Sequence, residues 1–188
     1  MEPLNVIGVS GSNRPESMTK KLVSLILEEA KKLEAKTELI DLAEENFPLY
    51  DEDIELNKKQ KELLESIEKA DVLVLGSPEF HGTLTGRMKN FIDFFPYNKE
   101  PSKLCFFVSS AGSRHGGMQT INAFKTIASN LNYFSHPTSL TVGAKETAEG
   151  KITDEAVLKR INKIASEIIK WGKKFREWIK KWIQSSSR

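Results

Sequence analysis

Short apolar runs alternate with longer amphipathic stretches along the chain, and this alternation constrains the fold more than any other feature. Five strands are predicted, at Leu4–Ser10, Thr37–Asp41, Val72–Gly76, Leu104–Ser109 and Phe134–Val142. Each run is followed by a stretch with helical spacing, at Ser17–Leu33, Asn57–Lys69, Thr85–Phe95, Gly117–Leu131 and from Thr153 onward. Strands that are apolar along their whole length are buried on both sides, so the pattern predicts a parallel sheet between two layers of helices.

Five strand–helix units fit the size of one domain, because the chain has 188 residues. They predict an α/β fold with a flavodoxin-like, doubly wound, five-stranded parallel sheet and helices on both faces. We expect residues 1–188 to form this single domain, with a long amphipathic helical extension over about residues 153–184. Ligands of such sheets bind beyond the carboxyl ends of the strands, so the loops after the first, third and fourth strands form the candidate site.

Charge and cysteine content narrow the class of protein. The formal net charge of +2 offers no global field for nucleic acid, so no nucleic-acid partner is expected. No apolar run is long enough to span a bilayer. The single cysteine, Cys105, lies in an apolar strand, where we expect an inert core thiol. With neither an internal disulfide nor a signal peptide, the chain is expected in the cytoplasm.

The loop after the first strand, GVSGSNRPESMT (Gly8–Thr19), is rich in hydrogen-bond donors. It carries a guanidinium and four hydroxyl groups, on Arg14, Ser10, Ser12, Ser17 and Thr19. A helix that begins near Ser17 presents free backbone amides and the positive end of its dipole, and both suit an anion. An ordinary helix N-cap would explain Ser17 alone, so the loop predicts a phosphate site.

Other well-known motifs do not match this chain. The P-loop pattern G-x-x-x-x-G-K-[ST] is absent, and Gly8 and Gly11 do not give the G-x-G-x-x-G spacing of a dinucleotide fold. A hydrolase elbow, G-x-S-x-G, would need glycine where Ser12 stands. None of the three histidines has a partner at metal-ligand spacing, so no metal site is predicted.

The loops after the third and fourth strands suit a flat ligand. In GSPEFHGTLTGRMKNFIDFF (76–95), Phe80 and His81 place two planar side chains at the end of a strand. The alternative is a proline-led turn with His81 exposed and idle. In SSAGSRHGGMQT (109–120), three glycines allow close approach of the backbone to a ligand: Gly112, Gly116 and Gly117.

Together the three loops resemble the NAD(P)H-dependent FMN reductase family, flavodoxin-like flavoenzymes that include quinone, azo and chromate reductases. GSNRPESMT resembles the G-S-x-R-x-x-S phosphate loop of that family, and AGSRHGG its glycine-rich loop after the fourth strand. PEFHGTLTGRMKNFIDF resembles the P-E-Y-x-x-S-x-x-G-x-L-K-N-x-x-D segment. The resemblance spans residues 4–142. Phe80 stands where tyrosine is usual, Thr83 where serine is common and Met88 where leucine is common, and none of these differences removes a backbone-mediated contact.

The resemblance implies FMN as the cofactor and NADPH or NADH as the cosubstrate. It implies a phosphate site formed by Ser10, Ser12, Arg14, Ser17 and Thr19, with Met18 as a further cofactor-binding residue. The isoalloxazine ring would rest against Pro78, Glu79, Phe80, His81 and Gly82, with Ser110, Ala111, Gly112 and Gly116 near its other side. Glu79 has an equal alternative, in which only its backbone meets the flavin and its carboxylate points to solvent.

The implied reaction passes hydride from the nicotinamide to FMN and then to a small acceptor, such as a quinone, flavin, azo or nitro compound. FMN carries this chemistry, so no catalytic side chain is expected. A flavodoxin-type electron carrier is the main alternative, although such carriers usually have strongly acidic surfaces that a charge of +2 does not provide. A regulatory nucleotide-binding module without turnover is the second. Lys89, Asn90 and Asp93 match the family pattern and are expected to serve the structure or a dimer contact.

The last stretch, INKIASEIIKWGKKFREWIKKWIQSSSR (161–188), has an apolar stripe at helical spacing, formed by Ile161, Ile164, Ile168, Trp171, Phe175, Trp178 and Trp182. A helix over 153–183 would be about 45 Å long, more than its own sheet can cover. Gly172 is the expected bend in it. The stripe would fold back on its own domain, contact a partner subunit, or lie on an anionic membrane surface. The regular stripe favours the subunit contact, in a homodimer or homotetramer.

Overall fold

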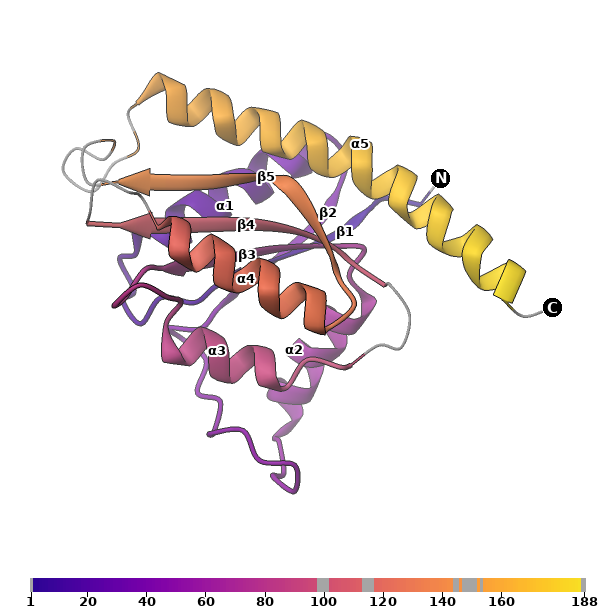
Figure 1. The fold of residues 1–188 in the computed structure, drawn as a ribbon, viewed down its shortest axis with the longest axis horizontal. Coiled ribbons are helices and arrows are strands. Elements are labelled where there is room, and N and C mark those ends of the chain that lie inside the picture. The colour runs from indigo at the N-terminus through magenta and orange to yellow at the C-terminus, as the bar shows by residue number, and fades with distance from the viewer. Residues whose placement is uncertain are drawn as a thin grey trace.

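A computed structural model describes residues 2–97, 102–112, 117–143, 146, 152 and 154–186. Its strands are β1 (Asn5–Ser10), β2 (Lys36–Asp41), β3 (Val72–Pro78), β4 (Leu104–Ala111) and β5 (Phe134–Gly143). Its helices are α1 (Met18–Lys32), α2 (Lys58–Lys69), α3 (Gly86–Asp93), α4 (Met118–Asn130) and α5 (Glu155–Ser186). The strands pair in parallel in the order β2-β1-β3-β4-β5, which is the flavodoxin-like order and confirms the predicted fold class (Figure 1).

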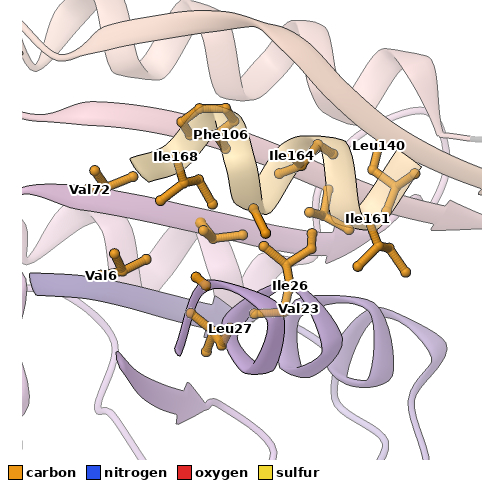
Figure 2. Close-up of a cluster of buried hydrophobic side chains, with 14 of the residues drawn as sticks. Val6, Val23, Ile26, Leu27, Val72, Phe106, Leu140, Ile161, Ile164 and Ile168 are labelled. Carbon is orange, nitrogen blue, oxygen red and sulfur yellow. The ribbon is translucent and has the colours of Figure 1, made fainter. Parts of the chain in front are cut away.

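Alternate residues of each strand face opposite layers of helices. On one side, Val6 and Phe106 pack with Ile26 of α1 and Ile164 of α5, as Figure 2 shows. On the other side, the next residues along the strands pack against α2, α3 and α4, with Phe91 of α3 wholly buried. The two apolar layers exclude water from both faces of the sheet. A polar ligand can therefore bind only at the loops beyond the strand ends.

The predicted elements differ from the observed ones mainly at their ends. β3 and β4 each run two residues further than predicted, because their ladder continues to the pair Pro78 and Ser110. β5 lies at the edge of the sheet, where a proline is tolerated. Its register to β4 shifts between Cys105 and Phe107, opposite the stretch that contains Pro137.

Helix α5 packs closely against the sheet at Gly172, the position of the expected bend. It runs from Glu155 to Ser186 without interruption, so Gly172 is not a break between two helices. Gly172 is buried, and a β-carbon on it would lie 2.9 Å from both Leu4 Cδ1 and Val72 Cγ2. The glycine therefore lets α5 approach the amino ends of β1 and β3 closely. Beyond this contact the helix projects past the sheet (Figure 1).

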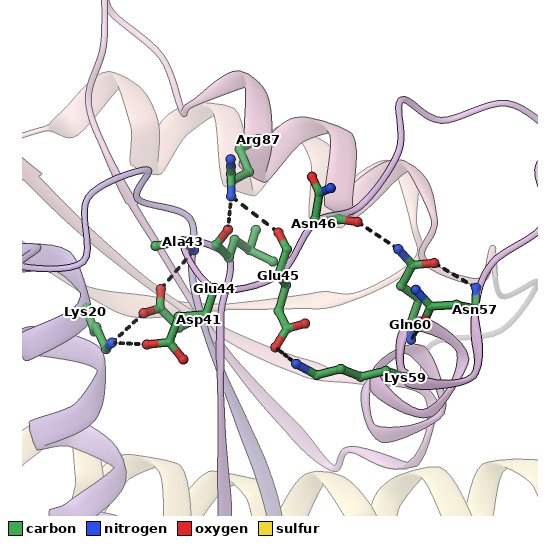
Figure 3. Close-up of polar contacts among 11 residues, drawn as sticks. Lys20, Asp41, Ala43, Glu44, Glu45, Asn46, Asn57, Lys59, Gln60 and Arg87 are labelled. Atoms are coloured by element: carbon green, nitrogen blue, oxygen red, sulfur yellow. Dashed lines mark hydrogen bonds and ion pairs between the residues drawn. The ribbon is translucent and has the colours of Figure 1, made fainter.

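Polar contacts hold the connection between β2 and α2 in place (Figure 3). Arg87 of α3 donates hydrogen bonds to the carbonyl oxygens of Leu42 and Glu45. Asn57 and Gln60 form a capping box at the start of α2, and the Gln60 amide also donates to the Asn46 carbonyl at 2.8 Å. These bonds attach the connection to α3 on one side and to α2 on the other.

The three family-pattern residues of α3 have structural contacts. Asn90 donates to the Pro48 carbonyl at 2.7 Å and accepts from the Tyr50 backbone amide at 2.8 Å. Lys89 and Asp93 form an ion pair one turn apart on the helix. This supports the structural one of the two roles expected for them.

Cys105 is completely buried in β4, and burial raises the pKa of its thiol to about 12. The thiol is therefore neutral at physiological pH, as expected of an inert core cysteine.

Candidate functional site

A pocket of about 340 Å³ opens at the carboxyl ends of four neighbouring strands. Ten of the predicted site residues line it: Ser12, Arg14, Ser17, Met18, Pro78, Glu79, Phe80, Ser110, Ala111 and Gly112. Its size is that of a site for a small organic ligand. The strand order reverses between β1 and β3, so the pocket lies where a doubly wound sheet binds its ligand.

The β1–α1 loop is held by its own hydroxyl groups. Ser12 Oγ accepts a hydrogen bond from the Arg14 amide at 3.1 Å. Ser17 is the N-cap of α1, and its hydroxyl accepts from the Lys20 amide at 3.4 Å, so the ordinary reading of Ser17 holds. Both side chains also line the pocket, and they fix the backbone of the loop around the start of α1.

Ser10 and Thr19 lie beneath this loop and are completely buried. Thr19 Oγ1 shares a hydrogen bond of 2.8 Å with Ser110 Oγ, which ties the first turn of α1 to the end of β4. Ser10 Oγ has no hydrogen-bond partner among the residues that the structure describes. A buried hydroxyl without a partner is costly, so Ser10 has donor capacity left for a ligand.

Three basic residues lie on or beside the β1–α1 loop, and two of them form ion pairs with acidic side chains. Lys20 Nζ lies 2.6 Å from Asp41 and 3.0 Å from Glu44, and the hydrogen bond to Asp41 raises the pKa of the lysine (Figure 3). Lys21 Nζ lies 3.2 Å from Glu16. Arg14 is exposed on the pocket wall, and no acid within the described ranges pairs with its guanidinium. Arg14 is thus the cation best placed to meet an anion.

The β3–α3 loop contains a tight turn. Phe80 and Thr83 exchange backbone hydrogen bonds of 2.9 and 3.2 Å, and the two residues between them have positive φ, 50° for His81 and 82° for Gly82. These angles define a type I′ turn, which favours glycine at the second central position. Phe80 lines the pocket and is 42% exposed, whereas His81 and Gly82 point into solvent at the tip and do not line it.

Glu79 links two loops of the pocket. Its carboxylate accepts a hydrogen bond of 3.1 Å from the Thr120 amide in the first turn of α4, and its own amide donates to the Ser110 carbonyl at 2.9 Å. The alternative in which the carboxylate points only to solvent is therefore wrong. The charge stabilises the positive end of α4 and holds Pro78–Phe80 against the end of β4.

Four lining residues were not among the predicted site residues. Glu16 and Lys21 lie at the start of α1, and Val142 and Gly143 lie at the end of β5. The helical spacing from Ser17 to Lys21 gives one turn and could have identified the lysine. Gly116, a predicted contact, lies outside the described residues.

Metal-ligand clusters and membrane-spanning helices are both absent from the part of the chain that the structure describes. No cluster of three or more histidine, cysteine or acidic residues that could hold a metal ion occurs there. No helix there is both long and apolar enough to cross a bilayer.

Comparison with known proteins relates the sequence of this chain to one family. The sequence profile of the family described as NADPH-dependent FMN reductase matches residues 4–147. An NAD(P)H-dependent FAD/FMN reductase of Geobacillus thermodenitrificans is 28% identical over 171 residues, which cover 88% of this chain and 92% of the relative. The NADH-dependent FMN reductase SfnE of Pseudomonas putida is 28% identical over 170 residues, covering 89% of this chain and 91% of SfnE.

A solved structure shows the same fold. The flavoenzyme NAD(P)H:(acceptor) oxidoreductase FerB of Paracoccus denitrificans superposes with a TM-score of 0.73 over 90% of this chain and 97% of FerB. The two sequences are 23% identical, so this likeness concerns the fold alone.

Proposed function

Since the chain belongs to the NADPH-dependent FMN reductase family, we propose that the pocket holds FMN with its phosphate on the β1–α1 loop and its ring between Pro78–Phe80 and Ser110–Gly112. The protein is an NAD(P)H-dependent oxidoreductase that uses FMN as its cofactor. The residue roles and the choice of electron acceptor are the proposal.

One observation carries the proposed position of the phosphate. The start of α1, the free guanidinium of Arg14 and the unpartnered, buried hydroxyl of Ser10 come from the same loop. Free amides at a helix N-terminus bind a phosphate, and an arginine adds a charge-assisted hydrogen bond. Because Ser12 and Ser17 already accept bonds from the loop backbone, they supply its shape as well as donor groups.

When bound, FMN supplies the redox chemistry, taking up hydride from NAD(P)H and delivering electrons to an acceptor. The protein's own residues bind and orient. Glu79 fixes the Pro78–Phe80 segment through the Thr120 amide, and Phe80 offers a ring face at the open side of the pocket. The buried strand ends beneath the pocket exclude water from its floor.

We propose a small planar acceptor, a quinone, flavin, azo or nitro compound, that stacks at the Phe80 side. Phe80→Ala removes this stacking surface and leaves backbone contacts intact. It should therefore keep FMN bound and alter acceptor turnover, measured with one acceptor of each class. Unchanged kinetics with every acceptor would remove Phe80 from the proposal.

The test of the activity is spectroscopic. Protein loaded with FMN is mixed with NADPH or NADH under nitrogen, and the visible flavin band is followed. Bleaching by either nucleotide, with recovery on addition of an acceptor, is the expected result. A stable yellow colour with both nucleotides would favour the electron carrier instead, and failure to take up FMN would favour the regulatory module.

A homodimer or homotetramer and a cytoplasmic location remain predictions. The β2–α2 connection offers an apolar surface for a subunit contact, since Leu49 is 84% exposed, Tyr50 46% and Ile54 36%. Light scattering of the wild type and of Leu49→Ser tests it. A mass that the substitution does not change would move the contact elsewhere.

A further inference from the structure

We infer that the C-terminal half of α5 docks the protein on an anionic lipid surface. The docking surface is an aromatic strip formed by Phe134, Trp171, Phe175, Trp178 and Trp182. Its four α5 residues follow one another at steps of four, three and four, so they share one face of the helix. Adjacent rings lie close together, with centroids 5.6 Å apart for Phe134 and Trp178 and 6.2 Å for Trp178 and Trp182.

The strip is partly exposed. Phe134 is 45% exposed, Trp171 41% and Trp178 43%, whereas Phe175 packs in part against the core. A hollow of about 310 Å³ lies along it, lined by its rings together with Leu104, His136, Pro137 and Lys174. Contiguous apolar surface of this kind on a folded chain marks an interaction site.

The charges beside the strip are nearly all positive. Residues 170–184 contain one acid, Glu177, and six basic residues, Lys170, Lys173, Lys174, Arg176, Lys180 and Lys181. Lys174 and Lys170 hold their ammonium groups 5.0 and 5.5 Å from the Trp171 ring. Helical spacing puts Lys181 on the same side of the strip as these two.

Arg176 serves a different purpose, because it faces the domain. Its guanidinium lies 3.3 Å from the Asp71 carboxylate and donates to the Glu2 carbonyl at 2.7 Å. This pairing fastens α5 to the amino ends of β1 and β3, so the aromatic strip is presented on a fixed helix.

The positive charges beside the strip favour an anionic bilayer over a second copy of the chain. Antiparallel isologous pairing with a second copy along the strip would place the lysine row of one helix beside the lysine row of the other. A bilayer with acidic headgroups complements them and accepts tryptophan rings at headgroup depth. The charge pattern therefore reverses the sequence-based preference for a subunit contact at this helix.

The strip and the pocket lie at opposite ends of the sheet. Leu104 and Phe134 are the first residues of β4 and β5, whereas Ser110–Gly112 and Gly143 mark the carboxyl ends of the same strands at the pocket. In Figure 1 the carboxyl ends of β4 and β5 lie at the opposite end of the sheet from the C-terminal part of α5, so docking through the strip leaves the pocket end of the sheet free. The inference therefore stands or falls independently of the proposed function.

The experiment measures partition of the full-length, FMN-loaded protein onto vesicles. One set contains equal parts of phosphatidylglycerol and phosphatidylcholine, and the other contains phosphatidylcholine alone. All three tryptophans of the chain lie in the strip, so their fluorescence reports its surroundings directly. We expect sedimentation with the anionic vesicles only, a blue shift of the emission, quenching by lipids brominated in the acyl chain, and weaker binding at high salt.

Two variants separate the charges from the rings. Lys170→Gln/Lys174→Gln/Lys181→Gln should lower the partition coefficient roughly a hundredfold. Lys58→Gln/Lys61→Gln/Lys69→Gln removes the same charge from the exposed side of α2 and should change it little. Trp178→Ser/Trp182→Ser should abolish quenching by brominated lipid, and its thermal unfolding and NAD(P)H oxidation should match those of the wild type.

Three results would overturn the inference. The first is absence of sedimentation with anionic vesicles, and the second is equal sedimentation with both kinds of vesicle. The third is an equal loss of binding in the α2 control, which would leave only nonspecific attraction. A fall in oligomer mass in Trp178→Ser/Trp182→Ser, without any vesicle binding by the wild type, would assign the strip to a subunit contact.

Discussion

At the carboxyl end of the sheet, four polar side chains around the pocket hold partners within the protein, whereas at the amino end large apolar side chains meet solvent. Ser12, Ser17, Thr19 and Glu79 all hold backbone or hydroxyl partners around the pocket. Around the amino ends of β4 and β5, the rings of the aromatic strip lie along a projecting helix. The polar side chains at the pocket end are therefore held by internal hydrogen bonds, whereas the aromatic rings at the other end are partly exposed to solvent.

This difference indicates how each end binds. At the pocket, internal hydrogen bonds fix the loop backbones before any ligand arrives, so backbone amides and the exposed Arg14 guanidinium on the pocket wall can meet a ligand without breaking those bonds. Preorganisation of this kind lowers the entropic cost of binding. At the aromatic strip, binding would rely on exposed apolar area bordered by positive charge, which suits an extended lipid surface rather than one small molecule.

The largest expected effect compares the two halves of α5. Ile164→Ala removes a side chain that is 1% exposed under the helix and should lower the free energy of unfolding by about 2–5 kcal/mol. Trp178→Ala removes a ring that is 43% exposed at the surface and should cost less than about 1 kcal/mol. Urea unfolding of both variants measures this. Equal losses would make the strip part of the core and cancel the comparison.

The next effect concerns the pocket. Arg14→Ala should weaken FMN binding by about ten- to a hundredfold and leave riboflavin binding unchanged, because a charge-assisted hydrogen bond contributes roughly 1.5–3 kcal/mol. Lys21→Ala, at a cation already paired with Glu16, should lose less. Titration of the apoprotein with both ligands decides it. If the Arg14 variant loses equal affinity for both, the guanidinium does not contact the phosphate.

Gly172→Ala tests how closely α5 packs on the sheet, because helix propensity and close packing predict changes of opposite sign in the free energy of unfolding. Helix propensity alone predicts a gain of about 1 kcal/mol. The close approach to Leu4 and Val72 predicts a loss of about 1–3 kcal/mol, since the new methyl group has no room. Ser166→Ala on the exposed side of the same helix is the control and should be neutral or slightly stabilising. A more stable Gly172 variant would restore the glycine to the role of a bend.

The smallest effect is a pH dependence beside the strip. His136 is buried against the Phe106 ring, its Nδ1 accepts from the Thr138 amide, and Glu167 lies 3.8 Å away. Burial lowers the pKa of His136 below its ordinary 6.5, although Glu167 opposes this. The neutral form is therefore favoured in the folded state. Stability should be complete above about pH 6.5 and fall as the pH decreases towards the folded-state pKa, because the unfolded chain takes up the proton first.

His136→Asn should flatten this acid slope of the unfolding free energy. His81→Asn, at the exposed tip of the β3–α3 turn, should keep it. If both variants retain the wild-type slope, another group is responsible for the loss.

The sequence predicts the sheet well because each strand and helix has its own local pattern. Apolar runs such as Val72–Gly76 identify buried strands, and their alternation with helices indicates a parallel, doubly wound sheet. That the β1–α1 loop would line a site was also predictable, since Ser17 and Arg14 follow directly on a strand end. Contacts between distant segments were not, because no local signal joins Glu79 to Thr120 or Thr19 to Ser110.

Gly172 illustrates the same limit. A glycine in a helix signals either a bend or a close approach, and only the positions of Leu4 and Val72 distinguish the two. Likewise, the apolar stripe of α5 has one continuous spacing, but Ile161, Ile164 and Ile168 are buried, whereas Trp171 and Trp178 are 41% and 43% exposed. Length alone predicted that part of the stripe would remain uncovered, and the structure shows that this exposure begins at Trp171.

The most direct test of the account is the affinity of the wild-type apoprotein for FMN relative to riboflavin. The two ligands share the ring and differ in the phosphate, so the ratio isolates the β1–α1 loop. With the N-terminus of α1 and the Arg14 guanidinium both at the pocket, FMN should bind at least about a hundredfold more tightly. Equal affinity for the two ligands would contradict the proposed phosphate site and, with it, the orientation of the flavin in the pocket.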